Sequence, residues 1–151
     1  MSCEPVDFLK TAKDLLTTNK RESDTRAVIS RSYYAVYLRF REKGSAFAIA
    51  PAVLTASIGK TLKHEKLIRE LRISSNLAVA SIGDNFEWLY SARIRADYEL
   101  HKHVPAKDAQ QAYDNAVALN SEIDAFGLAQ LGTYLESHLR QKYAAYLPPN
   151  S

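Results

Sequence analysis

Residues 25–43, TRAVISRSYYAVYLRFREK, decide the fold class of this chain. Apolar side chains occur on nearly every side of a helix drawn through this stretch. A helix without a clear polar face packs at the centre of a bundle. Arg31 lies within the apolar run, so we expect its charge to have a partner, and we interpret Arg31 and Tyr34 as structural residues. The apolar side chains are Val28, Ile29, Tyr33, Tyr34, Val36, Tyr37, Leu38 and Phe40.

Helical periodicity continues on both sides of this segment, and no stretch alternates convincingly as a strand does. We find no repeat of fixed length. The predicted helices lie at about residues 8–16, 25–43, 60–72, 84–104, 106–126 and 128–146. The sequence therefore predicts an all-α architecture. We expect an antiparallel bundle of five to six helices in a single domain over residues 1–147, followed by a tail at 148–151.

Several polar residues and one glycine mark the expected helix ends. Asp24 is a predicted N-cap, and Asp84 is another, followed three residues later by Glu87 in a capping-box spacing. Residues 73–83, ISSNLAVASIG, carry no charge and are predicted to be irregular. Gly127 stands where a helix commonly ends in a left-handed residue.

The composition excludes several classes of protein. The chain has 151 residues, of which 46% are hydrophobic and 25% charged, so it is neither disordered, collagen-like nor a disulfide scaffold. A single cysteine, Cys3, cannot form an internal disulfide, which favours a reducing, cytoplasmic location. The formal net charge of +3 is compatible with nucleic acid without requiring it.

No segment reads as a signal peptide or a membrane span. The N-terminus, MSCEPVDFLK, has early acidic residues and no apolar core. The uncharged segment 44–59 is too short to cross a bilayer and contains Pro51. We interpret it as a mobile or partner-facing connection, or alternatively as an apolar loop packed on its own domain.

The familiar catalytic and cofactor motifs are missing from the sequence. Gly59-Lys60-Thr61 resembles the end of a phosphate-binding loop, but Leu54 occupies the position of the required first glycine. No dinucleotide fingerprint or serine nucleophile motif occurs. His101 and His103 are the only close histidine pair, and they would diverge on a helix. We predict no cofactor and no metal site.

One dense cluster of chemically useful side chains remains, at residues 93–103, RIRADYELHKH. An imidazole can deprotonate a 2′-hydroxyl or protonate a leaving oxygen, and a guanidinium can hold the phosphate. This set suits metal-independent cleavage of RNA. A structural interpretation also stands, in which the two arginines pair with Asp97 or Glu99 near the helix end.

A row of basic residues precedes this cluster on the helix predicted at 60–72. It drifts around the helix rather than forming one stripe, so it is either a solvated face or a rim that attracts phosphate and RNA. The predicted phosphate-binding residues are Lys60, Lys63, Lys66 and Arg69.

Three segments together resemble the HEPN family of helical domains. They are AVISRSYYAVYLRFREKG, which is similar to that family's A-x-S-R-x-Y-Y-A helix, KHEKLIREL, and RIRADYELH, which is similar to the late R-x-x-A-D-Y segment of a prokaryotic branch. The resemblance implies a homodimer, often a metal-independent endoribonuclease with an Arg-x(4–6)-His site. Several members are toxins paired with a minimal nucleotidyltransferase antitoxin, or are defence components.

Carried onto this chain, the family motif places the catalytic pair at Arg95 and His101. Arg93, Asp97, Tyr98 and His103 would be supporting residues. The motif arginine could instead be Arg93, although the spacing to His101 then becomes too long. Two positions depart from the common pattern, because Ala96 follows the arginine and His103 stands where toxins commonly carry tyrosine.

Three hypotheses follow from the sequence. In the first, the chain is an endoribonuclease acting on single-stranded RNA, as the toxin of a toxin–antitoxin or defence system. Alternatively, it is a catalytically silent module of the same fold that binds a nucleotide or a nucleotidyltransferase partner. The third hypothesis is a helical adaptor that uses the segment 44–59.

Overall fold

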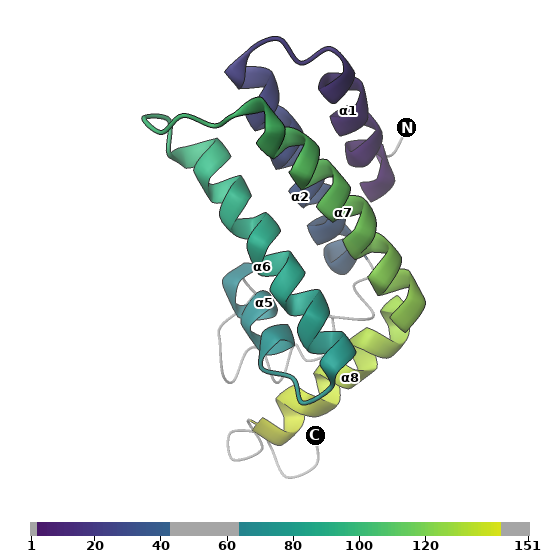
Figure 1. The fold of residues 1–151 in the computed structure, drawn as a ribbon. Helices are drawn as coiled ribbons and strands as arrows, with labels where there is room; N and C mark the ends of the chain where they lie inside the picture. Colours follow the sequence, from purple (N-terminus) through teal and green to yellow (C-terminus); the bar gives the residue numbers. More distant parts are fainter. Residues whose placement is uncertain (1–2, 43–63, 143–151) are drawn as a thin grey trace. The chain divides into compact units, whose positions relative to one another are not determined.

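The computed structural model describes residues 3–42 and 64–142, and these residues form six α-helices and no strand (Figure 1). The predicted all-α fold class is therefore confirmed. The helices are α1 (Pro5–Thr17), α2 (Glu22–Glu42), α5 (His64–Arg72), α6 (Leu77–Tyr98), α7 (Ala106–Phe126) and α8 (Leu128–Lys142).

Residue contacts group the chain into two compact units. The first comprises Met1–Arg39 and Asn85–Glu122, and the second comprises Phe40–Asp84 and Ile123–Ser151. The prediction of a single domain stays a prediction. The segment 44–59, the residues Lys60 and Lys63 and the tail at 148–151 lie outside the described residues.

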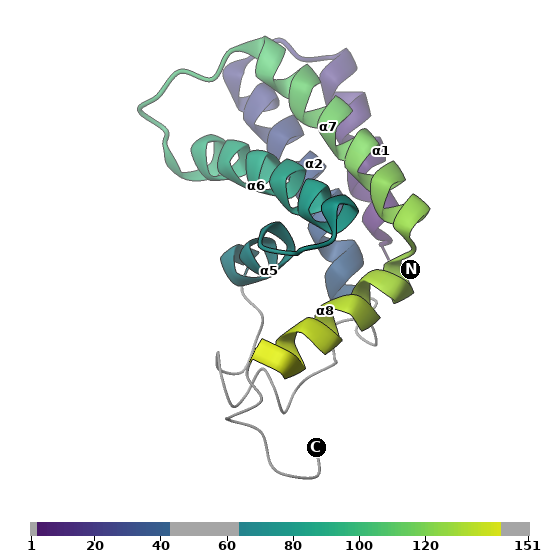
Figure 2. The same ribbon diagram turned by 60° about the horizontal axis from the view of Figure 1, so that its bottom comes forward.

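The first unit is built around α2, as its apolar sequence predicts. Small buried residues allow three helices to pack closely, with Ala12 of α1 and Ala109 of α7 meeting Val28 of α2 (Figures 1 and 2). Leu15, Leu16 and Tyr113 cover this contact. Further along, Ile29, Tyr33, Ala35 and Val36 of α2 are also buried, so the helix has no wide polar face.

The start of α6 differs from the prediction. Residues 77–83 are helical rather than irregular, and Asp84 is an interior residue of α6 rather than its N-cap. The cap is Asn76, whose Oδ1 accepts hydrogen bonds from the backbone N–H groups of Ala78 (3.0 Å) and Val79 (3.3 Å). The uncharged stretch is helical because Val79 and Ile82 are buried, so packing outweighs its weak local signals.

The other predicted helix ends show one correction and two confirmations. α2 begins at Glu22, and Asp24 lies within its first turn, where its carboxylate accepts hydrogen bonds from the N–H groups of Lys20 and Arg21. Asp24 therefore reaches back from the third helical position instead of capping the helix. The predicted bounds of α7 are confirmed, and Gly127 ends it with a φ of 91°.

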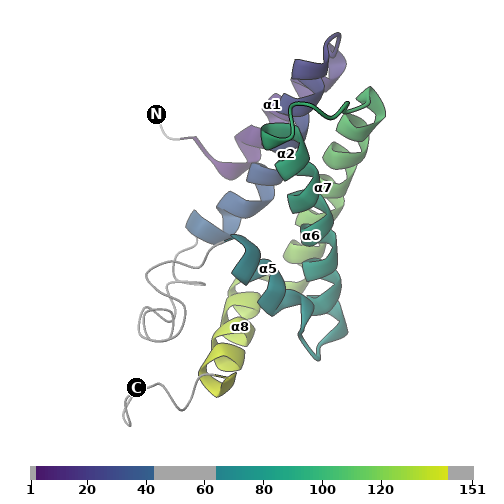
Figure 3. The ribbon, with the colours of Figure 1, turned by 90° about the vertical axis from the view of Figure 1, so that its left-hand side faces the viewer.

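The second unit has its own apolar core and a close helix contact. α5 lies beside the first turns of α6 (Figure 3), where a Cβ added to Gly83 would lie 2.5 Å from the backbone nitrogen of Arg72. Glycine is needed there because the backbones approach too closely for a side chain. The buried apolar residues are Phe40, Leu67, Ile68, Leu71, Val79, Ile82, Ile123, Leu131 and Leu135.

Two polar contacts join α5 and the residues after it to α8 within this unit. Glu70 has a fully buried side chain, and its carboxylate lies 3.0 Å from Nε2 of His138. The hydroxyl of Ser74 lies 2.7 Å from that of Tyr134. Hydrogen bonds from Ser74 and Ser75 lower the pKa of Tyr134. The contact with His138 gives the buried carboxylate of Glu70 a partner, and without one its burial would be costly.

Among the helices that the structure describes, none is both long enough and apolar enough to cross a membrane.

Candidate functional site

The candidate site lies in the first unit and begins with a buried arginine. Arg93 of α6 is 5% exposed, and its guanidinium lies among four tyrosine rings. Its Cζ atom is 5.0 to 5.6 Å from the ring centroids, a range in which a desolvated cation is attracted by the aromatic faces. The four rings belong to Tyr33, Tyr34, Tyr90 and Tyr98.

A carboxylate one turn further along α6 completes this environment. Asp97 Oδ2 lies 3.6 Å from Nη1 of Arg93 and accepts a hydrogen bond from the hydroxyl of Ser30 at 3.3 Å. Nη1 also donates to the hydroxyl of Tyr98 at 3.5 Å. Nε of Arg93 is buried and has no hydrogen-bond partner in the described part of the chain. The cation is therefore held by rings as much as by hydrogen bonds.

Burial and charge act in opposite directions on this arginine. Burial by itself lowers the pKa of Arg93, but Tyr34, Tyr33, Tyr98 and Asp97 together raise it, so the side chain stays a cation. Burial also raises the pKa of Tyr33 far above its ordinary value, so its phenol stays neutral. Arg93 thus has the contacts of a structural residue and is withdrawn from solvent.

The charge of Arg31 was expected to have a partner, and it has an aromatic neighbour, but the apolar run does not enclose the side chain. Arg31 is exposed, and its guanidinium lies 6.0 Å from the ring of Phe8. The arginine of this unit that requires a buried partner is Arg93.

The predicted catalytic pair lies on the solvent side of the same helix end. The side chain of Arg95 is 54% exposed, and its Nε lies 3.9 Å from a carboxylate oxygen of Glu99. The other oxygen of Glu99 lies 3.2 Å from Nζ of Lys102. His101 is exposed in the turn after α6 and makes no hydrogen bond or ion pair with the described residues. Glu99 therefore sits between two exposed cations, next to a free imidazole in sequence.

The end of α6 is held by a residue that sequence reasoning missed. Arg26 of α2 donates hydrogen bonds to the backbone carbonyls of Arg95 (3.0 Å), Ala96 (2.8 Å), Glu99 (3.3 Å) and Lys102. The first two carbonyls belong to the last turn of α6, where intrahelical partners run out, and the other two lie in the turn that follows. The side chain of Arg26 is only 12% exposed. No pattern in the sequence marks an arginine whose partners are backbone atoms.

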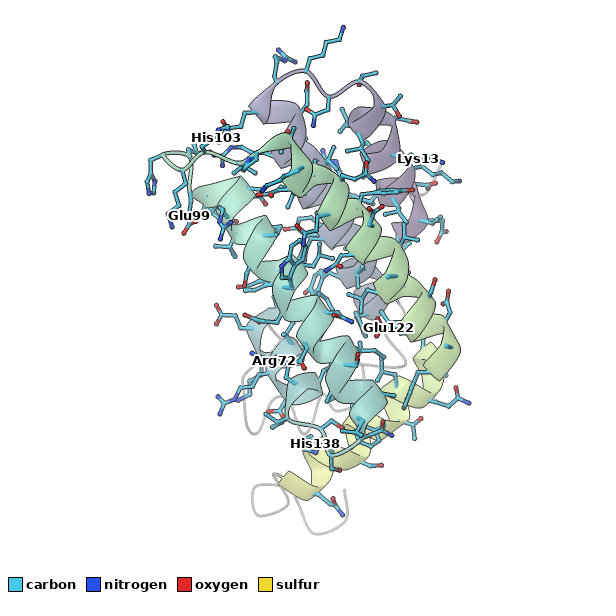
Figure 4. All side chains as sticks on the ribbon, viewed as in Figure 1. Lys13, Arg72, Glu99, His103, Glu122 and His138 are labelled. Carbon is cyan, nitrogen blue, oxygen red and sulfur yellow. The ribbon has the colours of Figure 1, made fainter. Side chains whose placement is uncertain are left out.

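Glu22 links Arg26 to the far side of the same turn. Its Oε1 accepts hydrogen bonds from Arg26 Nη2 at 2.8 Å and from the N–H of Val104 at 3.3 Å. Its Oε2 lies 3.0 Å from Nδ1 of His103. Figure 4 shows His103 in the connection between α6 and α7. The hydrogen bonds from Arg26 and then His103 lower the pKa of Glu22. The spacing of Glu22 and Arg26, one helical turn, was the available signal for this pair.

The predicted supporting residues fall into two groups within the first unit. Asp97 and Tyr98 contact Arg93, whereas His103 contacts Glu22. Lys66 and Arg69 lie on α5, in the second unit. Within residues 3–42 and 64–142, no three His, Cys, Asp or Glu side chains are grouped so that they could hold a metal ion.

In comparisons with known proteins, no protein-family model matches this chain, and no curated protein or solved structure is significantly similar to it.

Proposed function

We propose that this chain is a metal-independent endoribonuclease acting on single-stranded RNA, with Arg95 holding the scissile phosphate and His101 moving the proton. The observation that supports the proposal is the position of Glu99, whose carboxylate pairs with both Arg95 and Lys102 at the protein surface. Exposed ion pairs of this kind contribute little to stability, so an incoming phosphate can displace Glu99 and take both cations. The two cations and His101 then surround the phosphodiester.

The chemistry needs no further group from the protein. His101 takes the proton of the ribose 2′-hydroxyl, the 2′-oxygen attacks the phosphorus, and the bond to the 5′-oxygen breaks. The leaving oxygen takes a proton from an imidazolium, and a cyclic phosphate remains. Arg95 stabilises the charge that develops on the phosphate oxygens. Arg93 takes no part in these steps because it is buried and paired with Asp97.

The acting form is proposed to be a homodimer in which each subunit supplies one Arg95 and one His101. One imidazole then acts as base and the other as acid. This part of the proposal, and a role as a toxin neutralised by a nucleotidyltransferase partner, rest on the resemblance to HEPN domains. Light scattering coupled to gel filtration measures the subunit number directly.

The test is cleavage of fluorescent single-stranded RNA by purified protein in the presence of EDTA. We expect His101→Ala to lower the rate on the order of 10²-fold to 10⁴-fold, as loss of a general acid–base does. Arg95→Ala should lower it comparably. Lys107→Ala, at an exposed position in the first turn of α7, is the matched surface control and should leave the rate unchanged.

A second measurement separates cleavage from binding. Glu99→Gln removes the carboxylate that competes with phosphate, so it should tighten the binding of a cleavage-resistant RNA. If wild-type protein binds this RNA but cuts none, a silent binding module is the correct alternative. If His101→Ala cuts at the wild-type rate, the assignment of His101 is wrong.

A further inference from the structure

The turn that carries His101 has few contacts of its own. It runs from Glu99 to His103 between α6 and α7, and Leu100 at its start is 73% exposed. One backbone hydrogen bond, from the N–H of Lys102 to the carbonyl of Glu99 at 3.1 Å, closes it. Val104, which follows the turn, is buried at 2% exposure. Such a turn does not fix an imidazole by itself, so its order depends on outside contacts.

Those contacts come from one face of the first turns of α2. The guanidinium of Arg26 offers five N–H donors in a rigid plane. They are directed at Glu22 and at four backbone carbonyls, two at the end of α6 and two within the turn. Glu22 in turn receives the N–H of Val104 and faces the ring of His103. The pair therefore brackets the turn from its first residue to the residue after its last.

We infer that Arg26 and Glu22 are positioning residues that hold the His101 turn in its active conformation, and that His103 belongs to this clamp rather than to the reacting groups. The inference rests on the proposed function for its catalytic consequence. The clamp lies wholly within the first unit, and none of its side chains is a reacting group in that function. Its loss should therefore act on the rate of the chemical step rather than on RNA binding.

The test uses two conservative variants that keep the size of the side chains. Glu22→Gln removes the charge and keeps one oxygen acceptor. Arg26→Lys keeps the charge but replaces the planar fork by a single ammonium, which cannot reach the end of α6 and the turn at the same time. Arg31→Ala is the control, because Arg31 lies on the same helix, is exposed and contacts the ring of Phe8 instead of the turn.

Two readouts are measured on each variant. Hydrogen exchange at the amides of residues 99–104 should become about tenfold faster or more, the effect of losing a charged hydrogen bond, while amides in α7 stay unchanged. In the RNA assay kcat should fall on the order of 100-fold with KM nearly constant, because a small displacement of a reacting group has an effect of that size. Arg31→Ala should match wild type in both.

The outcomes separate the inference from the proposed function. If exchange in the turn rises but kcat stays at the wild-type value, the turn needs no clamp and the inference is overturned. It is also overturned if exchange does not change. If wild-type protein cuts no RNA, the proposed function fails, and the exchange measurement alone then decides whether Arg26 and Glu22 order the turn.

Discussion

The environment of Arg93 permits a quantitative prediction about stability. We consider Arg93→Met, which keeps a long side chain but removes the charge from the four tyrosine rings. Losing one partner of a buried ion pair costs about 3–5 kcal/mol. The side chain of Asp97, the partner, is 26% exposed and would keep its hydrogen bond from Ser30. We therefore take the lower part of that range.

The new methionine offsets part of this cost. Sulfur contacts with aromatic rings contribute roughly 1 kcal/mol, so we expect Arg93→Met to lower the free energy of unfolding by about 2–3 kcal/mol. Urea unfolding followed by circular dichroism measures this change. Arg31→Met is the control, since an exposed arginine with one ring contact should change the same quantity by less than about 0.5 kcal/mol.

A double-mutant cycle identifies the interaction responsible. Asp97→Asn removes the opposite charge, and the combination with Arg93→Met should be more stable than the sum of the single effects by about 1–2 kcal/mol. If Arg93→Met is as stable as wild type or more so, the reasoning is refuted. That result would show that the free-energy cost of desolvating the guanidinium exceeds the stabilisation that the rings and Asp97 provide.

Three further predictions concern other parts of the fold. Gly83→Ala should lower the free energy of unfolding by about 2 kcal/mol, because the added Cβ meets the backbone of Arg72. This cost outweighs a gain in helix propensity of up to about 1 kcal/mol. Thermal unfolding measures the change, and a stabilised variant would show that the contact relaxes. Asn76→Ala should cost about 1 kcal/mol through loss of the N-cap, and an unchanged midpoint in urea would contradict the cap. The pKa of Glu22 is lowered from 4.5, so its stabilisation is present above pH 4.5 and is lost as the pH falls through its lower value in the folded state. The difference in unfolding free energy between wild type and Glu22→Gln should therefore shrink below pH 4.5, and a difference that stays constant there would count against the hydrogen bonds to Glu22.

The predictable parts of the fold are those recorded in local sequence. Helical periodicity and Gly127 suffice for α7 and its end, because each signal lies within or beside the helix itself. The start of α6 was missed because residues 77–83 have no charged face. Gly83 resembles a helix breaker when it is in fact a residue of close helix packing.

The candidate site was only partly predictable for a related reason. The sequence places Arg93, Arg95 and His101 near one helix end but does not say which arginine is buried. Arg93 faces the tyrosines of α2, and this follows from how α2 and α6 pack rather than from either sequence alone. Arg26 was missed entirely, because its partners are carbonyl oxygens that every residue possesses.

The way α6 ends has a consequence for how the protein folds. Arg26 is separated from its carbonyl partners by 69 to 76 residues, so the helix boundary at Tyr98 depends on a distant part of the chain. A synthetic peptide of residues 77–104 lacks that side chain, and no glycine follows Tyr98 to end its helix. During refolding, contacts between remote segments form late. We therefore expect the turn that carries His101 to become ordered only after α2 has packed against α6.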